Sequence, residues 1–211
     1  MSEYAKLAKV EVKARGRGMQ ARVRLPDKVK FTSDSGNFIN FYCGMGQYEC
    51  GLSTAVGRPG WRWFVNSLGG EGNGGGTFGE FQNGEQVTIK LTLNNATGQT
   101  EFWVNGHCKY VFSRRWSEQT GFDNCRFIFG ALTAQYNGQT LPPWGSWHTL
   151  AVANSLMYKD AAKVWRPLER SVATVSAFHW PSGVQCPDPQ DYMVHDETLN
   201  CGAVSAELWC N

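Results

Sequence analysis

Tryptophan and amide side chains are the residues of this sequence whose types could bind a ligand most directly. The chain has 211 residues, of which nine are tryptophans, and aromatic residues make up 13% of the total. Flat apolar rings can stack on the apolar face of a ring-shaped ligand, while amides form hydrogen bonds at its edge. The candidates for stacking are Trp61, Trp63, Trp103, Trp116 and Trp144, and those for hydrogen bonding are Asn66, Asn105 and Gln82. Core packing is the competing explanation for each of them.

The acidic residues do not show the arrangement that glycoside hydrolysis needs. Glycosidases hold two carboxylates on either side of the scissile bond, which on a strand requires acidic residues two or four positions apart. The acidic residues of the central part are scattered: Glu49, Glu80, Glu85, Glu101 and Asp123. A closer group, Asp191 with Asp196 and Glu197, lies near the C-terminus. The sequence therefore favours binding over catalysis.

The sequence contains no complete motif for a metal site, a dinucleotide cofactor or a catalytic nucleophile. The four histidines, at 107, 148, 179 and 195, do not pair at a metal-ligand spacing, and there is no Gly-x-Ser-x-Gly motif. Residues 70–75 match Gly-x-Gly-x-x-Gly, but a dinucleotide site also needs a helix that begins at this point. The following residues continue as a glycine-rich loop, so we expect no cofactor and no metal.

Seven cysteines point to disulfides. No Cys-x-x-Cys pair is present, which argues against a zinc ribbon or a thioredoxin-like motif. Cys43 and Cys50 flank a turn-like Gly-Met-Gly segment, and Cys201 and Cys210 bracket the end of the chain. We expect these two pairs to form disulfides, which would place the protein outside the cell or on its surface. Buried free thiols are the alternative.

Charge and hydropathy exclude two further classes of partner. The formal net charge is +2 and 18% of the residues are charged, whereas nucleic-acid binding calls for a strongly basic face. No apolar run approaches the roughly 18 residues that span a bilayer. We therefore expect neither a nucleic-acid partner nor a membrane span.

Residues 85–112 predict a β-meander that would position these side chains. Val87, Ile89 and Leu91 alternate with polar residues, which is the pattern of a strand with one buried face. Strands at 99–104 and 107–112 follow, joined by Asn105-Gly106, a strong signal for a two-residue hairpin turn. Further alternating runs predict strands near 7–13, 19–25, 38–43, 48–54, 61–66, 125–133, 147–158 and 171–179.

These short strands, with turns between them and no long helical pattern, predict an all-β, antiparallel two-sheet sandwich of the jelly-roll type. We assign residues 1–180 to the sandwich domain. Residues 181–211 contain three prolines and three cysteines, and we expect an irregular C-terminal tail packed on the sandwich.

Three blocks of the sequence carry a resemblance to a known superfamily. They are Gly60-Trp61-Arg62-Trp63-Phe64, Gly84-Glu85-Gln86-Val87-Thr88-Ile89 and Phe102-Trp103-Val104-Asn105-Gly106. In this order they resemble the concanavalin A-like lectin/glucanase sandwich over residues 5–180. The resemblance implies a jelly-roll fold and a polysaccharide or glycan as partner.

Three functions remain open from the sequence. The first is a non-catalytic, carbohydrate-binding, lectin-like module. The second is a secreted structural or assembly subunit of a coat, appendage or capsid, because an odd number of cysteines allows a bridge between chains and hence a homo-oligomer. The third is a glycan-active hydrolase or lyase with an atypical site.

Overall fold

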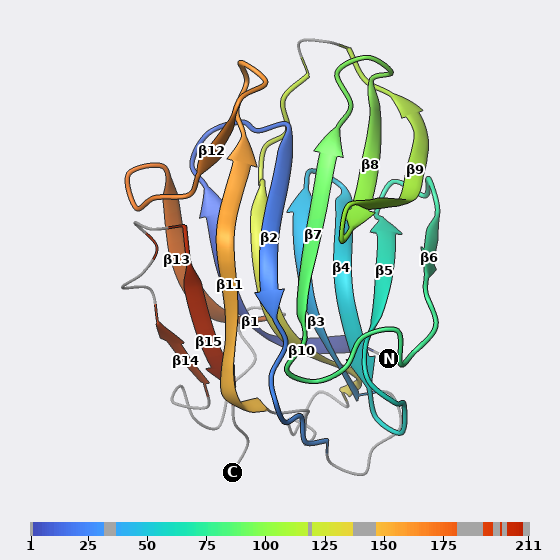
Figure 1. Ribbon diagram of the computed structural model, residues 1–211, viewed down its shortest axis with the longest axis vertical. Helices are drawn as coiled ribbons and strands as arrows, with labels where there is room; N and C mark the ends of the chain where they lie inside the picture. Colours follow the sequence, from blue (N-terminus) through green and yellow to red (C-terminus); the bar gives the residue numbers. More distant parts are fainter. Residues whose placement is uncertain are drawn as a thin grey trace.

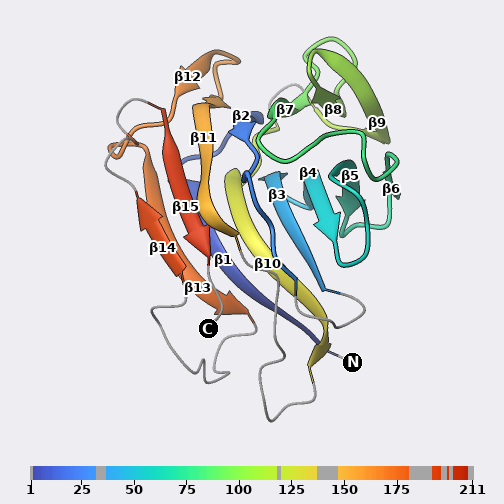
Figure 2. The same ribbon diagram turned by 60° about the horizontal axis from the view of Figure 1, so that its bottom comes forward.

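The architecture comes from a computed structural model of the chain. The structure describes residues 2–31, 37–117, 120–136, 147–180, 192–195, 199 and 202–208. These residues form two antiparallel β-sheets packed face to face (Figure 1), and the second view shows the two layers with the interior between them (Figure 2). The predicted two-sheet sandwich is confirmed.

The first sheet, called the groove sheet below, has seven strands in the order β13-β1-β10-β3-β4-β5-β6. The strands are β13 (Ala173–Trp180), β1 (Ser2–Val12), β10 (Arg126–Tyr136), β3 (Asn37–Met45), β4 (Tyr48–Ala55), β5 (Arg62–Ser67) and β6 (Asn73–Gly75). All neighbours are antiparallel, with β3 and β4 joined by a tight turn at residues 46 and 47.

The second sheet, called the meander sheet below, has the order β14-β15-β11-β2-β7-β8-β9, with β12 paired to β11. The strands are β14 (Tyr192–His195), β15 (Val204–Leu208), β11 (Trp147–Lys159), β2 (Gly18–Arg24), β7 (Gln86–Leu93), β8 (Gln99–Val104), β9 (His107–Arg115) and β12 (Trp165–Pro167). The predicted meander over 85–112 is therefore confirmed as β7, β8 and β9.

Side chains that alternate along the strands fill the space between the sheets. From the meander sheet, Val87, Ile89 and Leu91 are fully buried. From the groove sheet come aromatic rings, among them Phe41 and Phe129, whose centroids lie 5.3 Å apart at a steep angle. Burying one such side chain contributes about 1.5–3 kcal/mol to folding. Apolar contacts between the two sheets therefore stabilise the sandwich.

The Asn105-Gly106 turn forms as predicted. Asn105 has φ of 47° and Gly106 has φ of 80°, the signs that a type I′ turn requires. The Asn105 side chain also accepts a hydrogen bond from the Thr88 amide, at 2.8 Å. This residue therefore fixes the turn to the neighbouring strand.

Part of the predicted irregular tail is regular. Within 181–211, the described residues form β14 and β15, and β15 pairs with β11 in the meander sheet. Val204 and Ala206 are buried, so the short alternation at 203–208 was a strand signal that the prolines and cysteines of this segment obscured. No helix of the described chain is long and apolar enough to cross a membrane.

The expected disulfide between Cys43 and Cys50 is not formed in the structure. The two residues stand directly opposite each other on β3 and β4, as the turn predicted, but both are free thiols. They point into the sandwich and are fully buried, where a thiol packs as a small apolar side chain. Cys201 and Cys210 lie outside the described residues.

Candidate functional site

The outer face of the groove sheet carries a row of polar side chains across three strands. Asn40 of β3 stands opposite Ser53 of β4, and Ser53 stands opposite Arg62 of β5. Successive residues of a strand point to opposite faces, so these three lie on the face away from Phe41 and Leu52 of the core. We call this row the polar ladder.

Aromatic residues lie on both sides of the polar ladder. Phe38 lies two residues before Asn40 on β3, and Phe64 lies two residues after Arg62 on β5. Phe78 comes from the loop that follows β6, and Arg62 stacks on its ring with the guanidinium carbon 4.4 Å from the centroid. A polar strip between apolar rings results.

These residues line an open groove with a volume of about 1000 Å³. Its lining residues are Phe38, Asn40, Ser53, Ala55, Val56, Arg58, Arg62, Phe64, Val65, Asn66, Asn73, Gly74, Gly75 and Phe78. Ligand pockets in proteins typically measure about 300–1,000 Å³ and combine apolar walls with a few placed polar groups. The groove has this size and this composition.

Two polar atoms of the groove are buried without a hydrogen-bond partner in the described structure. They are Oδ1 of Asn40 and Nε of Arg62. Asn40 is only 8% exposed although it lies on an outer sheet face. A buried donor or acceptor without a partner costs about 1–3 kcal/mol, so a bound molecule that accepts from Nε or donates to Oδ1 would form a favourable hydrogen bond.

Beside the groove, a three-residue polar network covers the next part of the same face. Arg126 of β10 donates to Glu49 of β4 at 2.7 Å, and the Tyr42 hydroxyl donates to the same oxygen at 3.3 Å. Burial raises the pKa of the Tyr42 phenol well above its ordinary value, and the Glu49 carboxylate raises it further. The phenol is therefore a neutral hydrogen-bond donor.

Two glycines make room for this network. A Cβ atom at Gly44 would lie 2.7 Å from the Arg126 guanidinium, and one at Gly51 would lie 2.5 Å from Cβ of Tyr42. Both side chains can consequently lie close to the sheet surface. The Tyr42 ring also meets the Phe64 ring edge-on at 6.0 Å, which connects the network to the wall of the groove.

Of the side chains proposed from the sequence, the structure brings Asn66 into the groove. Trp61 is fully buried, stacks on Phe41 at 5.1 Å and donates its indole N–H to Asn83. Trp63 lies on the same inward face and is partly buried against the core. Both rings are packing residues because the face that they share is the inner one.

Trp103 and Trp116 lie away from the groove. Trp103 faces outward on the meander sheet, as predicted, where Lys90 Nζ lies 4.5 Å from its ring and Glu101 accepts its indole N–H. Trp116 packs against the core and donates to the Tyr48 hydroxyl at 3.0 Å.

Two amides proposed from the sequence hold loops. Asn105 fixes the turn described above, and Gln82 donates to the Gly79 carbonyl at 2.9 Å. Trp144 lies outside the described residues.

None of the three residues of the polar ladder, Asn40, Ser53 and Arg62, was among those proposed from the sequence. A signal for this face was present in residues 38–43, where Phe38 and Tyr42 alternate with the core residues Ile39, Phe41 and Cys43. A strand with large apolar side chains on both faces has more apolar surface than one core can bury. Such a strand is a reason to look for a ligand face.

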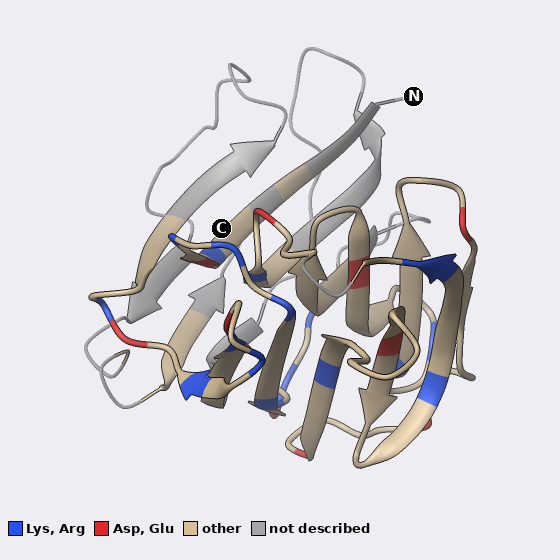
Figure 3. Cartoon of the chain, turned by 90° about the horizontal axis from the view of Figure 1, so that it is seen from above, with Lys and Arg blue, Asp and Glu red and all other residues tan. Residues whose placement is uncertain are grey.

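Positions of Lys and Arg and of Asp and Glu are spread over the described strands and loops (Figure 3). Among the described residues, no three His, Cys, Asp or Glu side chains gather closely enough to hold a metal ion. The groove differs from the rest, since the charged residues that line it are two arginines.

No protein-family model matches the sequence, and no curated protein matches it either. Among solved structures, scytalido-glutamic peptidase with a transition state analog inhibitor is similar over 96% of this chain and 97% of its own, with a TM-score of 0.62 and 9% identity. LamAcat from Zobellia galactanivorans is similar over 65% of this chain and 63% of its own (TM-score 0.38, 12% identity). The galectin LEC-6 from Caenorhabditis elegans is similar over 60% and 89% (TM-score 0.31, 16% identity).

Identities this low establish the fold and nothing finer. The similarity to the peptidase extends over nearly the whole chain and supports the antiparallel two-sheet sandwich that the sequence predicted. One fold of this kind hosts many unrelated functions.

Proposed function

We propose that this protein is a non-catalytic, carbohydrate-binding sandwich that holds a glycan in the groove of the groove sheet. The observation that carries the proposal is the polar ladder of Asn40, Ser53 and Arg62 between the rings of Phe38, Phe64 and Phe78. A glycan has the matching chemistry, because its rings have apolar faces and its edges carry hydroxyl groups.

The unpartnered oxygen of Asn40 supports the same proposal. A sugar hydroxyl can donate a hydrogen bond to Oδ1, and the Ser53 hydroxyl beside it can donate or accept. Asn66 and Asn73 add further amides at one end of the groove. A small number of placed polar groups on an apolar floor is how ligand pockets fix orientation.

Binding without hydrolysis is favoured by the side chains that line the groove. The described lining contains no carboxylate and no histidine, whereas glycosidases place two carboxylates about 5–9.5 Å apart across the bond. Glu49 lies beside the groove, opposite Asn66, and Arg126 and Tyr42 occupy its carboxylate. The hydrolase hypothesis and the assembly hypothesis have no comparable support.

A location outside the cell or on its surface remains part of the proposal, since many glycans are displayed there. The cysteines support it less than the sequence indicated, because the four described cysteines, including Cys43 and Cys50, are free thiols.

A glycan array followed by calorimetry with the best ligand tests the proposal, with Asn40→Leu as the key variant. Leucine has a similar shape and removes an unpartnered buried amide oxygen, so the fold should be as stable as before or more stable. Binding should fall at least about tenfold, the value of one good hydrogen bond. Gln20→Leu, which changes an amide on the outer face of the meander sheet, is the matched control.

Two results would contradict the proposal. One is the absence of binding to any glycan on the array by the correctly folded protein. The other is cleavage of peptide or glycan substrates by the purified protein that Asn40→Leu abolishes, which would make the groove an active site. Because the peptidase named above shares the fold, the substrate panel should include a protein substrate.

A further inference from the structure

The groove carries positive charge from two arginines that no carboxylate of the described residues neutralises. Arg62 and Arg58 both lie over the Phe78 ring, at 4.4 Å and 5.8 Å from its centroid. Within the described residues, neither guanidinium forms an ion pair with a carboxylate. Arg126 on the same face, by contrast, is paired with Glu49. The two groove arginines therefore present positive charge to whatever occupies the groove.

The position of Arg62 makes it a donor for a ligand. Its Nε is buried and has no hydrogen-bond partner in the described structure. Stacking on Phe78 holds the planar guanidinium by its face, which leaves its edge to form hydrogen bonds. A guanidinium edge offers parallel N–H groups that match the two oxygens of a carboxylate.

The strand beside Arg62 leaves space for such a group. Gly75 of β6 stands opposite Phe64, and a Cβ at Gly75 would lie 3.5 Å from Nη1 of Arg62. Gly74 also lines the groove. A side chain at Gly75 would lie on the outer face beside Arg62, so its absence lets a ligand approach the Arg62 guanidinium and the β6 backbone closely.

The polar ladder thus has an unpartnered donor at one end and an unpartnered acceptor at the other, with Ser53 between them. One ligand that carries an anionic group and a hydroxyl group could satisfy both. A uronic acid residue has this combination, since it carries a carboxylate on a ring whose other positions are hydroxyls.

We propose that the groove binds acidic polysaccharide, with a uronate carboxylate on the edge of Arg62, assisted by Arg58, and a sugar hydroxyl on Oδ1 of Asn40. This inference rests on the proposed function and specifies its ligand class. A sulfated sugar shares the anionic chemistry, and two of its oxygens can also meet a guanidinium edge, so the test includes a sulfated ligand.

Calorimetry with three oligosaccharides of equal length separates the alternatives: an oligogalacturonate, a neutral gluco-oligosaccharide and a sulfated oligosaccharide. The oligogalacturonate should bind at least about tenfold more tightly than the neutral ligand, as expected for a charge-assisted hydrogen bond. Its affinity should also fall between 50 and 500 mM NaCl, because salt screens the attraction.

Arg62→Gln should reduce oligogalacturonate affinity at least about tenfold and remove the preference over the neutral ligand, with Arg62→Lys between the two because lysine keeps the charge but not the planar edge. The matched control is Arg114→Gln, since Arg114 also stacks on an aromatic ring, 4.0 Å from the centroid of Trp116, but does not line the groove. Melting temperatures confirm that each variant is folded.

The outcomes distinguish this inference from the proposed function. Equal binding of the neutral and acidic ligands, or an unchanged affinity in Arg62→Gln, overturns the acidic preference and leaves glycan binding intact. Tighter binding of the sulfated ligand overturns the carboxylate assignment. Failure of all three ligands together with a blank glycan array overturns the proposed function itself.

Discussion

Arg126 extends across Gly44 and places its Nη2 atom 2.7 Å from Oε1 of Glu49. The two side chains are only 14% and 22% exposed, respectively, so the ion pair is shielded from water. It joins β10 to β4 over the intervening strand β3, beside the groove. The pair therefore stabilises the part of the sheet that borders the groove.

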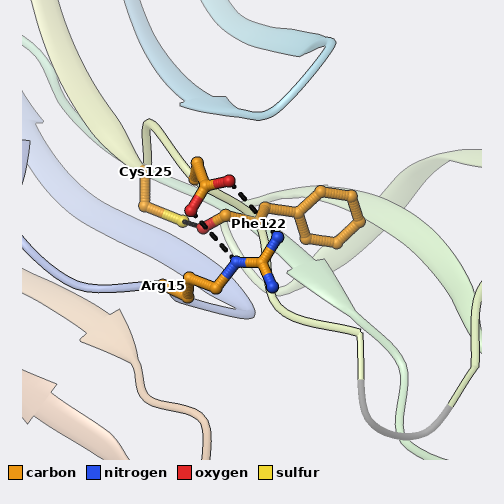
Figure 4. A network of polar contacts seen from close by, with 4 residues as sticks. Arg15, Phe122 and Cys125 are labelled. Atoms are coloured by element: carbon orange, nitrogen blue, oxygen red, sulfur yellow. Dashed lines mark hydrogen bonds and ion pairs between the residues drawn. The ribbon is translucent and has the colours of Figure 1, made fainter.

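Glu49→Gln should lower the free energy of unfolding by roughly 1–2 kcal/mol, because the change leaves Arg126 partly buried without its carboxylate. Chemical denaturation at neutral pH measures this. The control is Asp123→Asn, which breaks the bidentate pair with Arg15 at 3.0 and 3.3 Å (Figure 4). Those side chains are 66% and 68% exposed, so that change should cost less than about 0.5 kcal/mol. Equal costs would contradict the difference in burial.

The turn between β8 and β9 gives a second prediction. Gly106 has φ of 80°, a region that a β-branched residue adopts only with strain. Gly106→Val should destabilise the protein by about 2 kcal/mol, whereas Gly106→Asn should cost much less because asparagine tolerates positive φ. Thermal unfolding of the two variants provides the comparison. A valine variant as stable as the asparagine variant would rule out this turn geometry.

The buried thiols predict a loss of stability at alkaline pH. Burial raises the pKa of Cys125 to about 12, and it raises the pKa values of Cys43 and Cys50 well above the ordinary range. In the unfolded chain a thiol ionises near pH 8.5. The stabilising contribution is therefore complete below about pH 8.5 and decreases as the pH rises toward 12.

The expected slope is at most about 1.4 kcal/mol per pH unit for each thiol. Denaturant unfolding from pH 7.5 to 10.5 measures it, and Cys125→Ala should give a shallower slope than the parent protein at the cost of overall stability. Identical slopes in the two proteins would show that burial does not keep the Cys125 thiol protonated at alkaline pH.

The sequence predicted the strands well where one face of the strand is apolar. In β7, Val87, Ile89 and Leu91 all point into the core, so the period-two pattern was clear. Two of the strands that were not predicted, β6 and β12, lack this pattern. β6 consists of Asn73, Gly74 and Gly75 and owes its pairing to β5, while β12 spans only Trp165–Pro167 on the edge of β11.

The candidate site was predictable only in part because register is not visible in the sequence. Asn40, Ser53 and Arg62 come from three strands, and it is the pairing of those strands that places them in one row. Tryptophan was also a misleading guide. The alternation of Trp61 and Trp63 placed them on one face, but that face could equally be the inner one, and in the structure it is.

The two tryptophans Trp63 and Trp103 separate core packing from ligand binding. Trp63 packs against the core, so Trp63→Ala should lower the free energy of unfolding by about 3 kcal/mol, the lower end of the cost for a large aromatic side chain. Trp103 lies on the outer face of the meander sheet, held by Lys90 and Glu101. Trp103→Ala should therefore cost about 1 kcal/mol.

Neither substitution touches the polar ladder, so both variants, once folded, should bind the glycan as the parent protein does. Calorimetry at a temperature well below both melting transitions measures this. If Trp103→Ala abolished binding while Asn40→Leu left it unchanged, the ligand would lie on the meander sheet, and the groove would lose its proposed role. Loss of binding in Asn40→Leu alone would place the ligand against the polar ladder.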